Sequence, residues 1–569
     1  MAYRSGRERG ETKAAEEGLV ADMVRQFADR YAFVRELVQN AVDAGATRID
    51  VRAELAPGGR AVFSVRDDGA GMTRETIEGP LLTLFNSSKD ADRTKIGKYG
   101  VGFVSVFAIG PTEVVVESWR PGESWIVRLT ADHSYELAQG GEHEGSGTSV
   151  ALLKPLSEGE FPTHVEQIGS ALSRWCRHAG LPIRYLVPAP GGDAEPLVDQ
   201  RIDRPLGVAT ALSVTQEVDG ELIVAGPSAG APEQGESPSE SFIGFYNRGL
   251  TLFESTQPPT PGLAGVHVKI QSPHLQHTLS RDNVRHDEAY ERVLREAEDL
   301  VQGPLRAELR AALSAAARAA AEGSELERYA SLLTAACAPP LQLDRDEIEL
   351  PLLDPQGGRR VLQLDETLKL GDGVLYVGAT AVDLTTALAR AHVPVVRAAH
   401  RSVVRTLTGR LEAGAVQHVQ QAFLLAAEVP SQELAASDRA LCEATHHMLT
   451  LAGARAARVG LAETTGLEPP RGALAVPADG TEASHLLSRH EAATWWTRWK
   501  AAPTLLLPTS HEAVKRARAQ AEYDSQVAAN LLARALLVDE RGALGKRASD
   551  KLLAAGATAT RRPRRRARP

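Results

Sequence analysis

Five short runs of alternating apolar residues between Thr47 and Lys154 place the strongest constraint on the fold. They read TRIDVRAEL, RAVFSVRDD, TEVVVESW, SWIVRLT and GTSVALLK. Most are joined by short turns such as PGG and RPGE, a pattern typical of neighbouring antiparallel strands. Helical stretches and glycine-rich loops interrupt the series. We therefore predict an α+β sandwich, in which a mixed, mostly antiparallel sheet carries helices on one face.

The rest of the chain divides by composition. With 569 residues, 43% of them apolar, the chain is long enough for several cores. Segment GPSAGAPEQGESPSESF is too rich in Pro, Gly and Ser to pack, whereas an Ala-rich helix and a strand-helix-strand unit follow it. The predicted parts are a polar leader (1–16), the α+β domain (17–190), an α/β middle domain (202–410) with a flexible insertion (226–241), a mainly helical C-terminal domain (411–560) and a basic tail (561–569).

Charge and cysteine content exclude some classes of function. The net charge of −9 gives the body no general electrostatic reason to bind nucleic acid or an anionic membrane. The tail RRPRRRARP is basic, but a solvated tail is favoured over a dedicated nucleic-acid or lipid contact. Three distant cysteines support neither a disulfide framework nor a cysteine zinc site. With no apolar run of transmembrane length, we expect a soluble, cytoplasmic protein without a membrane partner.

The stretch FVRELVQNAVDAGATRID combines polar and apolar helix positions. Glu36, Asn40 and Asp43 are spaced i, i+4, i+7, so a helix places them along one face. Gly45 ends the helix before the next strand begins. Taken alone, this triplet is better explained as a solvated polar face than as a site.

A second pattern, VFSVRDDGAGM, ends a strand with two carboxylates and two glycines. Phe63, Val65 and Asp67 share one strand face, which turns Asp67 toward the packed helices. A carboxylate there needs hydrogen-bond donors, and the exocyclic amine of adenine is one. Gly69 and Gly71 allow the backbone to approach a planar ring closely, although such a segment can also be only a tight turn.

Two weaker patterns follow. KIGKYGVGF places Gly97, Gly100 and Gly102 before an apolar helical run, where free backbone amides can hold phosphates. It lacks the Lys-Ser/Thr ending of a Walker loop. GTSV places the hydroxyl of Thr148 at the start of a strand, where it can reach a pocket.

Together and in this order, the four patterns resemble the GHKL ATPases, which include type II topoisomerase subunits, ninety-kilodalton heat-shock chaperones, histidine kinases and MutL proteins. The resemblance implies that Asn40 holds Mg²⁺ between protein and ATP, that Glu36 activates the attacking water, and that Asp67 reads adenine. It further assigns ATP-binding roles to Asp43, Gly69, Gly71, Met72, Ser87, Lys98, Gly100, Val101, Gly102, Phe103 and Thr148. A glutamate at position 36 favours hydrolysis over transfer to a histidine.

The phosphate loop decides between branches of that superfamily. IGKYGVGFVSVF resembles the HtpG-like, ninety-kilodalton heat-shock chaperone family rather than the GxRGEAL loop of MutL proteins. FIGFYNRGLTLFE resembles a strand pair of that family's middle domain, and LSRDNVR its arginine motif. The resemblance makes Arg281 a catalytic candidate that reaches the γ-phosphate, against the alternative of an ordinary surface arginine.

Other patterns are weaker. His446, His447, His485, His490 and His511 lack the spacing of a metal site, so surface or core histidines are favoured. ATWWTRW, at residues 493–499, is better explained as a packing cluster than as a stacking platform for bases.

These observations lead to one expected function and two alternatives. The expected protein binds Mg²⁺ and ATP, hydrolyses ATP, and clamps protein clients by closing its lid and domains, as a chaperone of the stress response would. Whether it forms a homodimer is left open. One alternative is a DNA-transacting or defence-associated GHKL ATPase, with nucleic acid reached through the basic tail. The other is a nucleotide sensor that does not hydrolyse ATP.

Overall fold

The computed structural model places most of the chain in two compact units. It describes residues 29–82, 101–132, 134–189, 195–228, 241–278, 283–353, 361–380, 382–478, 483–494, 501–538 and 544–560. The first unit comprises Met1–Ser228 with Ser239–Leu305, and the second comprises Ala229–Pro238 with Arg306–Pro569. The first unit therefore contains the predicted ATP-binding domain and the first part of the predicted middle domain. The predicted leader and basic tail lie outside the described residues.

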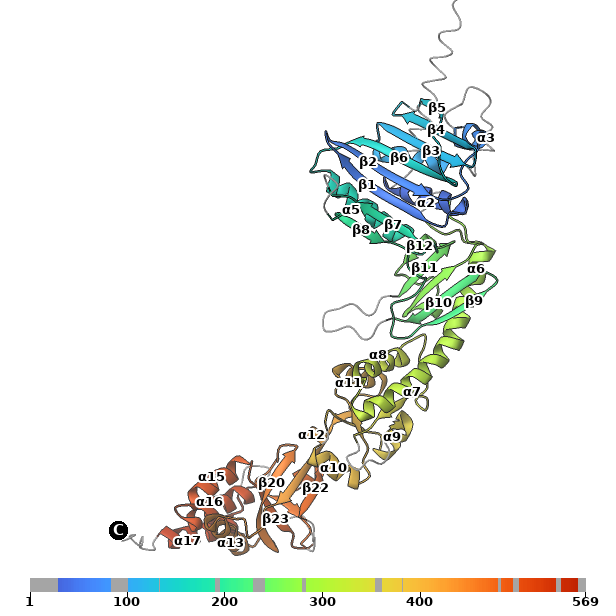
Figure 1. The fold of residues 1–569 in the computed structure, drawn as a ribbon. Helices are drawn as coiled ribbons and strands as arrows, with labels where there is room; N and C mark the ends of the chain where they lie inside the picture. The colour runs from blue at the N-terminus through green and yellow to red at the C-terminus, as the bar shows by residue number, and fades with distance from the viewer. Residues whose placement is uncertain are drawn as a thin grey trace, which may run out of the picture. The chain divides into compact units, whose positions relative to one another are not determined.

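An eight-stranded sheet is the larger of the two sheets described in the first unit (Figure 1). Its strands are β1 (Ile49–Ala56), β2 (Arg60–Asp67), β3 (Glu113–Arg120), β4 (Glu123–Thr130), β5 (Tyr135–Gln139), β6 (Gly147–Pro155), β7 (Ile183–Val187) and β8 (Val198–Arg201). Their order is β5-β4-β3-β6-β2-β1-β7-β8. Only the β1–β7 pair is parallel, so the sheet is mixed and mostly antiparallel as predicted. All five strands expected from the sequence are present; β5 and β8 were not predicted.

Helices cover one face of this sheet. They are α2 (Ala32–Asp43), the short α4 (Val101–Val104) with its 3₁₀ extension η3 (Ser105–Ile109), and α5 (Phe161–Trp175). Phe33 and Val34 of α2 pack with Phe63 and Val65 of β2 in one core, because the strand alternates buried and exposed residues while the helix repeats its apolar positions every three to four. A short α3 (Arg74–Thr76) and a π-helical turn η1 (Ile77–Leu81) follow β2.

A second sheet completes the first unit. Its strands are β9 (Val214–Val218), β10 (Glu221–Pro227), β11 (Phe242–Asn247), β12 (Leu250–Ser255) and β13 (Val266–Gln271), in the order β12-β11-β13-β10-β9. They are followed by α6 (Glu288–Leu300) and η5 (Val301–Leu305), with a 3₁₀ turn η4 (Pro261–Leu263) before β13. β11 and β12 form the antiparallel pair expected from FIGFYNRGLTLFE. Gly226 and Pro227, expected to open the flexible insertion, instead end β10.

The second unit begins with the expected Ala-rich helix. Its elements are α7 (Arg306–Glu322), α8 (Leu326–Cys337), β14 (Glu349–Pro351), β15 (Val361–Gln363), α9 (Leu364–Leu370), β16 (Leu375–Gly378), α10 (Asp383–Arg390), β17 (Val395–Arg397), α11 (Arg401–Arg410) and β18 (Val416–His418). β16 pairs in parallel with both β17 and β18. The strand-helix-strand unit predicted from the sequence is therefore β16, α10 and β17.

The C-terminal region is rich in helix, as predicted, and it also contains a sheet that the sequence did not reveal. The helices are α12 (Val419–Ala422), α13 (Ala436–Leu451), α14 (Arg489–Ala493), α15 (Glu512–Ala521), α16 (Ser525–Leu537) and α17 (Lys546–Thr560). The strands β19 (Phe423–Glu428), β20 (Arg458–Gly466), β21 (Leu474–Val476), β22 (Ser484–Ser488) and β23 (Thr504–Pro508) take the order β21-β23-β20-β19-β22. No helix in the described ranges is long and apolar enough to cross a bilayer.

Candidate functional site

A cavity of about 340 Å³ lies between α2 and the large sheet. Its volume is in the range of small-molecule sites, which lie between about 300 and 1,000 Å³. Nine residues predicted from the sequence line it: Glu36, Asn40, Asp43, Asp67, Gly71, Met72, Gly102, Phe103 and Thr148. Four separate patterns of the sequence therefore meet at one place.

α2 presents its polar residues to this cavity. Leu37 and Ala41 are buried in the core, and Gly45 follows the helix with a φ of 71°. Glu36, with only 8% of its surface exposed, lies deep in the cavity wall, whereas Asn40 and Asp43 are exposed toward its rim. The i, i+4, i+7 face thus lines the cavity, from the buried Glu36 to the exposed Asn40 and Asp43.

A neighbouring arginine pairs with Glu36. Arg35 Nη2 lies 3.1 Å from Glu36 Oε1, and the two side chains are 7% and 10% exposed. The Arg35 guanidinium carbon also lies 4.9 Å from the centroid of the Trp175 ring at the end of α5. Since a buried carboxylate without compensation is strongly unfavourable, this ion pair allows Glu36 to sit in the wall as an anion. Arg35 was not predicted from the sequence, because adjacent helix residues do not usually face each other.

Asp67 ends β2 at the base of the cavity. It pairs in register with Thr148 of β6, and its Oδ1 accepts a hydrogen bond of 2.8 Å from the Gly69 amide. Burial raises the pKa of Asp67; the adjacent Asp68 charge adds to the rise, and the amides of Gly69 and Thr148 oppose it. A ligand that donates a hydrogen bond here would therefore stabilise the ionised carboxylate.

Asp68 has a different environment from its neighbour. It accepts hydrogen bonds from the amides of Thr47 (2.7 Å) and Arg48 (2.9 Å) and from the Thr47 hydroxyl (2.6 Å). Burial acts to raise the pKa of Asp68, but these hydrogen bonds outweigh it and leave the pKa below its usual value. Asp68 thus connects the end of β2 to the start of β1, and only Asp67 serves the cavity.

Ser118 of β3 is a site residue that was not predicted from the sequence. Its buried hydroxyl accepts a hydrogen bond of 2.8 Å from the Met72 amide and lies 3.1 Å from the Thr148 hydroxyl. It thereby joins the turn after β2 to the start of β6. Ser118 is opposite Thr148 in the sheet register, so only knowledge of the strand order could have identified it.

The glycines of the turn have distinct positions. Gly71 has a φ of 66°, and a β-carbon there would lie 2.3 Å from the Trp119 carbonyl oxygen. Only glycine therefore allows the turn to lie on the end of β3. Gly69 is buried below the cavity rather than lining it; a β-carbon there would lie 2.9 Å from the Ala44 β-carbon.

The phosphate end of the predicted site is described only in part. Gly102 and Phe103 line the cavity, and Val101 begins α4. Ser87, Lys98, Gly100 and Arg281 lie outside the described residues. The described residues on either side of Arg281 are hydrogen-bonded to each other: the Thr278 amide donates to the Asn283 carbonyl at 2.9 Å.

The side-chain oxygens at the cavity suit a hard cation that takes most of its ligands from a bound nucleotide. Asn40 offers an exposed amide oxygen between two carboxylates on the same helix face. In the part of the chain that the structure describes, no three His, Cys, Asp or Glu side chains gather into a metal site. Mg²⁺ commonly takes one or two protein oxygens and completes its shell with phosphates and water, so Asn40 fits this mode.

Two of the five C-terminal histidines make local hydrogen bonds. His446 Nε2 lies 3.1 Å from the Ala456 carbonyl oxygen, and His511 Nδ1 accepts from the Ala513 amide at the start of α15. The tryptophans at 495, 496 and 499 lie outside the described residues, as does the basic tail.

Comparisons with known proteins agree with this geometry. Residues 31–141 match the family described as "Histidine kinase-, DNA gyrase B-, and HSP90-like ATPase". The N-terminal part of the chain is therefore a GHKL-type ATPase domain, as the sequence patterns predicted.

Individual relatives narrow the comparison. The chain is 30% identical over 205 residues to "Chaperone protein HtpG" of Wolbachia sp. subsp. Brugia malayi (strain TRS), covering 30% of this chain and 32% of the relative. It is 29% identical over 204 residues to the same-named protein of Anaplasma phagocytophilum (strain HZ), covering 30% and 31%. A shorter match, 44% identical over 73 residues, is to "DNA mismatch repair protein MutL" of Opitutus terrae (strain DSM 11246 / JCM 15787 / PB90-1), covering 12% of this chain and 11% of the relative. The chain thus spans about a third of the length of the HtpG relatives it matches.

Proposed function

We propose that this protein is a Mg²⁺-dependent ATPase that acts as a molecular chaperone, holding a protein client while its lid and domains close. The observation that carries the proposal is the cavity itself, where Glu36, Asn40, Asp67 and Thr148 line one space within a GHKL-type ATPase domain. The similarity to the HtpG relatives supports the chaperone role over the same part of the chain.

The base of the nucleotide would occupy the end of the cavity near Asp67. Its carboxylate accepts a hydrogen bond from the exocyclic amine of adenine, and the Thr148 hydroxyl contacts the same base directly or through water. Ser118 holds that hydroxyl and the Met72 amide in place. This arrangement selects adenine over guanine, because guanine presents a carbonyl where adenine presents the amine.

The phosphates would lie toward α2 and the start of α4. The Glu36 carboxylate orients the attacking water and accepts its proton, and Arg35 holds the carboxylate in the cavity wall. The Asn40 amide oxygen and the phosphate oxygens would bind Mg²⁺, which neutralises the charge of the phosphates. Roles for Ser87, Lys98, Gly100 and Val101 at the phosphates and for Arg281 at the γ-phosphate remain part of the proposal.

The test is steady-state ATP hydrolysis by the full chain beside Glu36→Ala, with calorimetric ATP binding for both. General-base removal should lower turnover by about 100-fold or more while ATP affinity stays within about twofold. Glu75→Ala, at an exposed position of α3 outside the cavity, is the matched control and should leave both quantities unchanged. A wild-type protein that neither binds nor hydrolyses ATP would refute the ATPase proposal.

The chaperone role needs its own measurement. Wild-type protein with ATP should suppress the light scattering of a thermally aggregating client, and Glu36→Ala should alter the ATP dependence of that suppression. Equal aggregation with and without the protein would overturn the chaperone part and leave the ATPase part intact.

The match to MutL supports a second candidate, a DNA-transacting ATPase with the same nucleotide site. Its test is duplex DNA binding across a salt series, with and without residues 561–569. Salt-dependent binding that is lost on deletion of this tail would place the DNA-transacting function first.

A further inference from the structure

The turn between β11 and β12 contains an arginine in an unfavourable backbone conformation. Asn247 pairs with Leu250, so Arg248 and Gly249 form a two-residue hairpin loop. Their φ angles are 47° and 77°. Gly, Asn or Asp usually occupies the first position of such a loop. A β-carbon there costs on the order of 1 kcal/mol, which Gly avoids and which the short polar side chains of Asn and Asp offset by local hydrogen bonds. Local preference therefore does not account for Arg248.

The guanidinium of Arg248 reaches the helix that forms the cavity wall. Arg248 Nη1 donates to Asp43 Oδ1 at 2.6 Å, across 205 positions of sequence. The other oxygen of Asp43 accepts from Gln39 Nε2 at 3.1 Å. Both partners are more than half exposed, at 59% and 51%, and an exposed ion pair adds only about 0–1 kcal/mol to stability. Stability alone thus gives little reason to place an arginine at this position.

The rest of the turn is docked tightly on the ATPase domain. A β-carbon at Gly249 would lie 1.6 Å from the His178 carbonyl oxygen, so the backbone there is in direct contact with the segment that follows α5. Two residues further on, the Thr251 hydroxyl donates to the Arg174 carbonyl at 2.8 Å. The backbone that carries Arg248 is therefore held against the ATPase domain on the C-terminal side of the turn, and its side chain extends toward Asp43.

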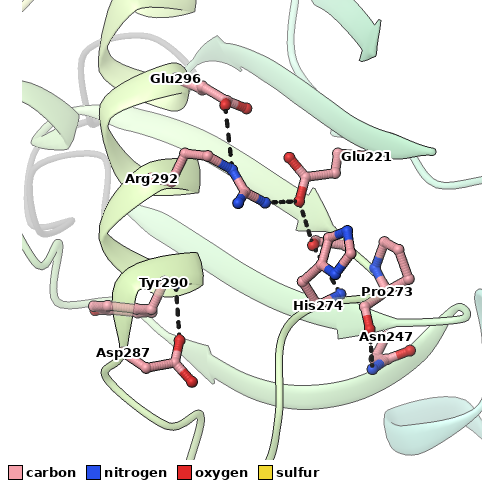
Figure 2. Close-up of polar contacts among 9 residues, drawn as sticks. Glu221, Asn247, Pro273, His274, Asp287, Tyr290, Arg292 and Glu296 are labelled. Carbon is pink, nitrogen blue, oxygen red and sulfur yellow. Dashed lines mark hydrogen bonds and ion pairs between the residues drawn. The ribbon is translucent and has the colours of Figure 1, made fainter. Parts of the chain in front are cut away.

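The residue before Arg248 connects the same turn to the segment after β13. Figure 2 shows Asn247 beside Pro273, and its Nδ2 donates to the carbonyls of Leu275 at 2.7 Å and Pro273 at 3.3 Å. That segment is itself held by buried groups. The Ser272 hydroxyl donates to Glu221 at 2.6 Å.

The Glu221 side chain that accepts from Ser272 also pairs with Arg292 of α6. In Figure 2 its guanidinium lies between Glu221 and Glu296, and it forms ion pairs with both. The side chain of Glu221 is only 8% exposed, so its charge is compensated inside the second sheet. Residues 272–275 therefore have a rigid support, and the turn at 247–249 joins that support to α2.

We propose that Arg248 is a positioning residue for ATP hydrolysis, acting through Asp43 on α2. This inference depends on the proposed ATPase function. Asp43 lies one turn after Asn40 and two turns after Glu36, so a fixed Asp43 orients the helix face that carries both groups. The turn at 247–249 thereby couples that face to the second sheet.

The substitution Arg248→Gly separates positioning from stability. It removes the guanidinium and also relieves the positive φ, so the unfolding midpoint should stay unchanged or rise. ATP turnover should nevertheless fall by about fivefold or more, with ATP affinity changed by less than about twofold. A purely structural role predicts the opposite: a lower midpoint and unchanged turnover by the folded protein. Either wild-type turnover or a parallel loss of affinity would overturn the inference.

Two further variants sharpen the test. Arg248→Lys keeps a cation within reach of Asp43, which accepts only one hydrogen bond from this residue, and should retain turnover within about twofold. Arg184→Ala breaks an equally exposed ion pair with Asp199 in the same unit and should leave turnover unchanged. A similar loss for Arg184→Ala would show that the effect is not specific to Arg248.

A double-mutant cycle tests the route through Asp43. In an Asp43→Ala background, Arg248→Gly should have no further effect on turnover, because the side chain that accepts from the Arg248 guanidinium is already removed. Independent, multiplicative effects would overturn the inference. If the wild-type protein has no ATP binding or turnover, the proposed function fails first; if the wild type is active and the cycle is multiplicative, only the role of Arg248 fails.

Discussion

The ATPase domain and the C-terminal helices both bury polar side chains, but they satisfy them differently. In the C-terminal region, buried Asp438 of α13 accepts two hydrogen bonds from Arg518 of α15, at 3.0 and 2.8 Å. Buried Asn530 of α16 donates to the Leu552 carbonyl at 2.7 Å. These groups are satisfied by the chain itself and join helices to one another.

In the ATPase domain, polar groups face a cavity instead. Asp67 lines it, and burial raises the pKa of this carboxyl group. A partly buried carboxylate with a raised pKa is not fully stabilised by its own chain. The two regions therefore illustrate a general distinction. Polar groups whose hydrogen bonds are made within the protein contribute to stability, whereas polar groups directed into a cavity can still form hydrogen bonds to a ligand.

The largest effect that tests this comparison concerns Asp67. In Asp67→Asn the Gly69 amide holds the remaining side-chain oxygen, and an NH₂ donor replaces the other oxygen and faces the amine of adenine, so loss of a hydrogen bond to a charged group should weaken ATP binding by about 100-fold. The unfolding midpoint should not fall, because the ionised carboxylate is unfavourable in the free protein. Calorimetry and thermal unfolding measure the two quantities.

Asp68→Asn is the matched control for that prediction. It removes the negative charge that strengthens the hydrogen bonds from the Thr47 and Arg48 amides, and it replaces the oxygen that accepts from the Thr47 hydroxyl, so it should lower the midpoint and leave ATP affinity within about twofold. Equal losses of affinity for both variants would contradict the distinction between the neighbouring carboxylates.

The next largest effect concerns the ion pair between Asp438 and Arg518 in the C-terminal region. Asp438→Asn should lower the free energy of unfolding of the second unit by about 2 kcal/mol, less than for a fully buried pair because Arg518 is 39% exposed. ATP affinity should not change. Glu512→Ala, which breaks an exposed pair with Arg516, should cost less than about 0.5 kcal/mol in the same chemical unfolding experiment. A change in ATP affinity for Asp438→Asn would break the comparison.

The smallest effect concerns His178 of the first unit, whose two ring nitrogens both form hydrogen bonds within the protein. Its Nδ1 donates to the Arg204 carbonyl at 3.0 Å, so its Nε2 accepts from Lys269 Nζ at 2.9 Å. Burial lowers the pKa of His178 from 6.5 to about 4, and the nearby charges of Lys269 and Arg177 add to the decrease. Glu254 and the Arg204 carbonyl oppose it. Burial likewise lowers the pKa of Lys269, to about 8.

This shift has a defined sign. Between pH 6.5 and 4 the unfolded chain binds a proton that the folded chain does not, so stability is present above pH 6.5 and is lost as pH falls toward 4. We expect a loss of about 1 kcal/mol between about pH 7 and 5.5, measured by chemical unfolding. His178→Gln should flatten this dependence, and His274→Gln, at an exposed position, should not. An unchanged slope for His178→Gln would refute the assignment.

Several features of the fold could be predicted from the sequence because they depend on local periodicity. The alternation in RAVFSVRDD both identified β2 and assigned Asp67 to the inner face. The spacing of Glu36, Asn40 and Asp43 placed them together on one wall of the cavity. In these cases, side-chain direction follows from a period of two or of 3.6 residues, which the order of residues specifies directly.

The C-terminal sheet could not be predicted in this way. Short apolar runs such as FLLAAE and TLLLP fit a strand and part of a helix equally well, and both became strands, β19 and β23. β23 pairs with β20, and each pair of partner residues is 46 positions apart in the chain, so the strand partner of β23 is not encoded locally.

The sequence by itself determined the α+β class, the helix face and strand end that carry the nucleotide residues, and the order of the four patterns. Only the tertiary structure decided which other groups support them. Ser118 meets the Met72 amide across 46 positions and Arg248 meets Asp43 across 205, and neither contact follows from any local period. Local preference argues against an arginine at position 248, and only the packing of the second sheet on the ATPase domain places its guanidinium beside Asp43.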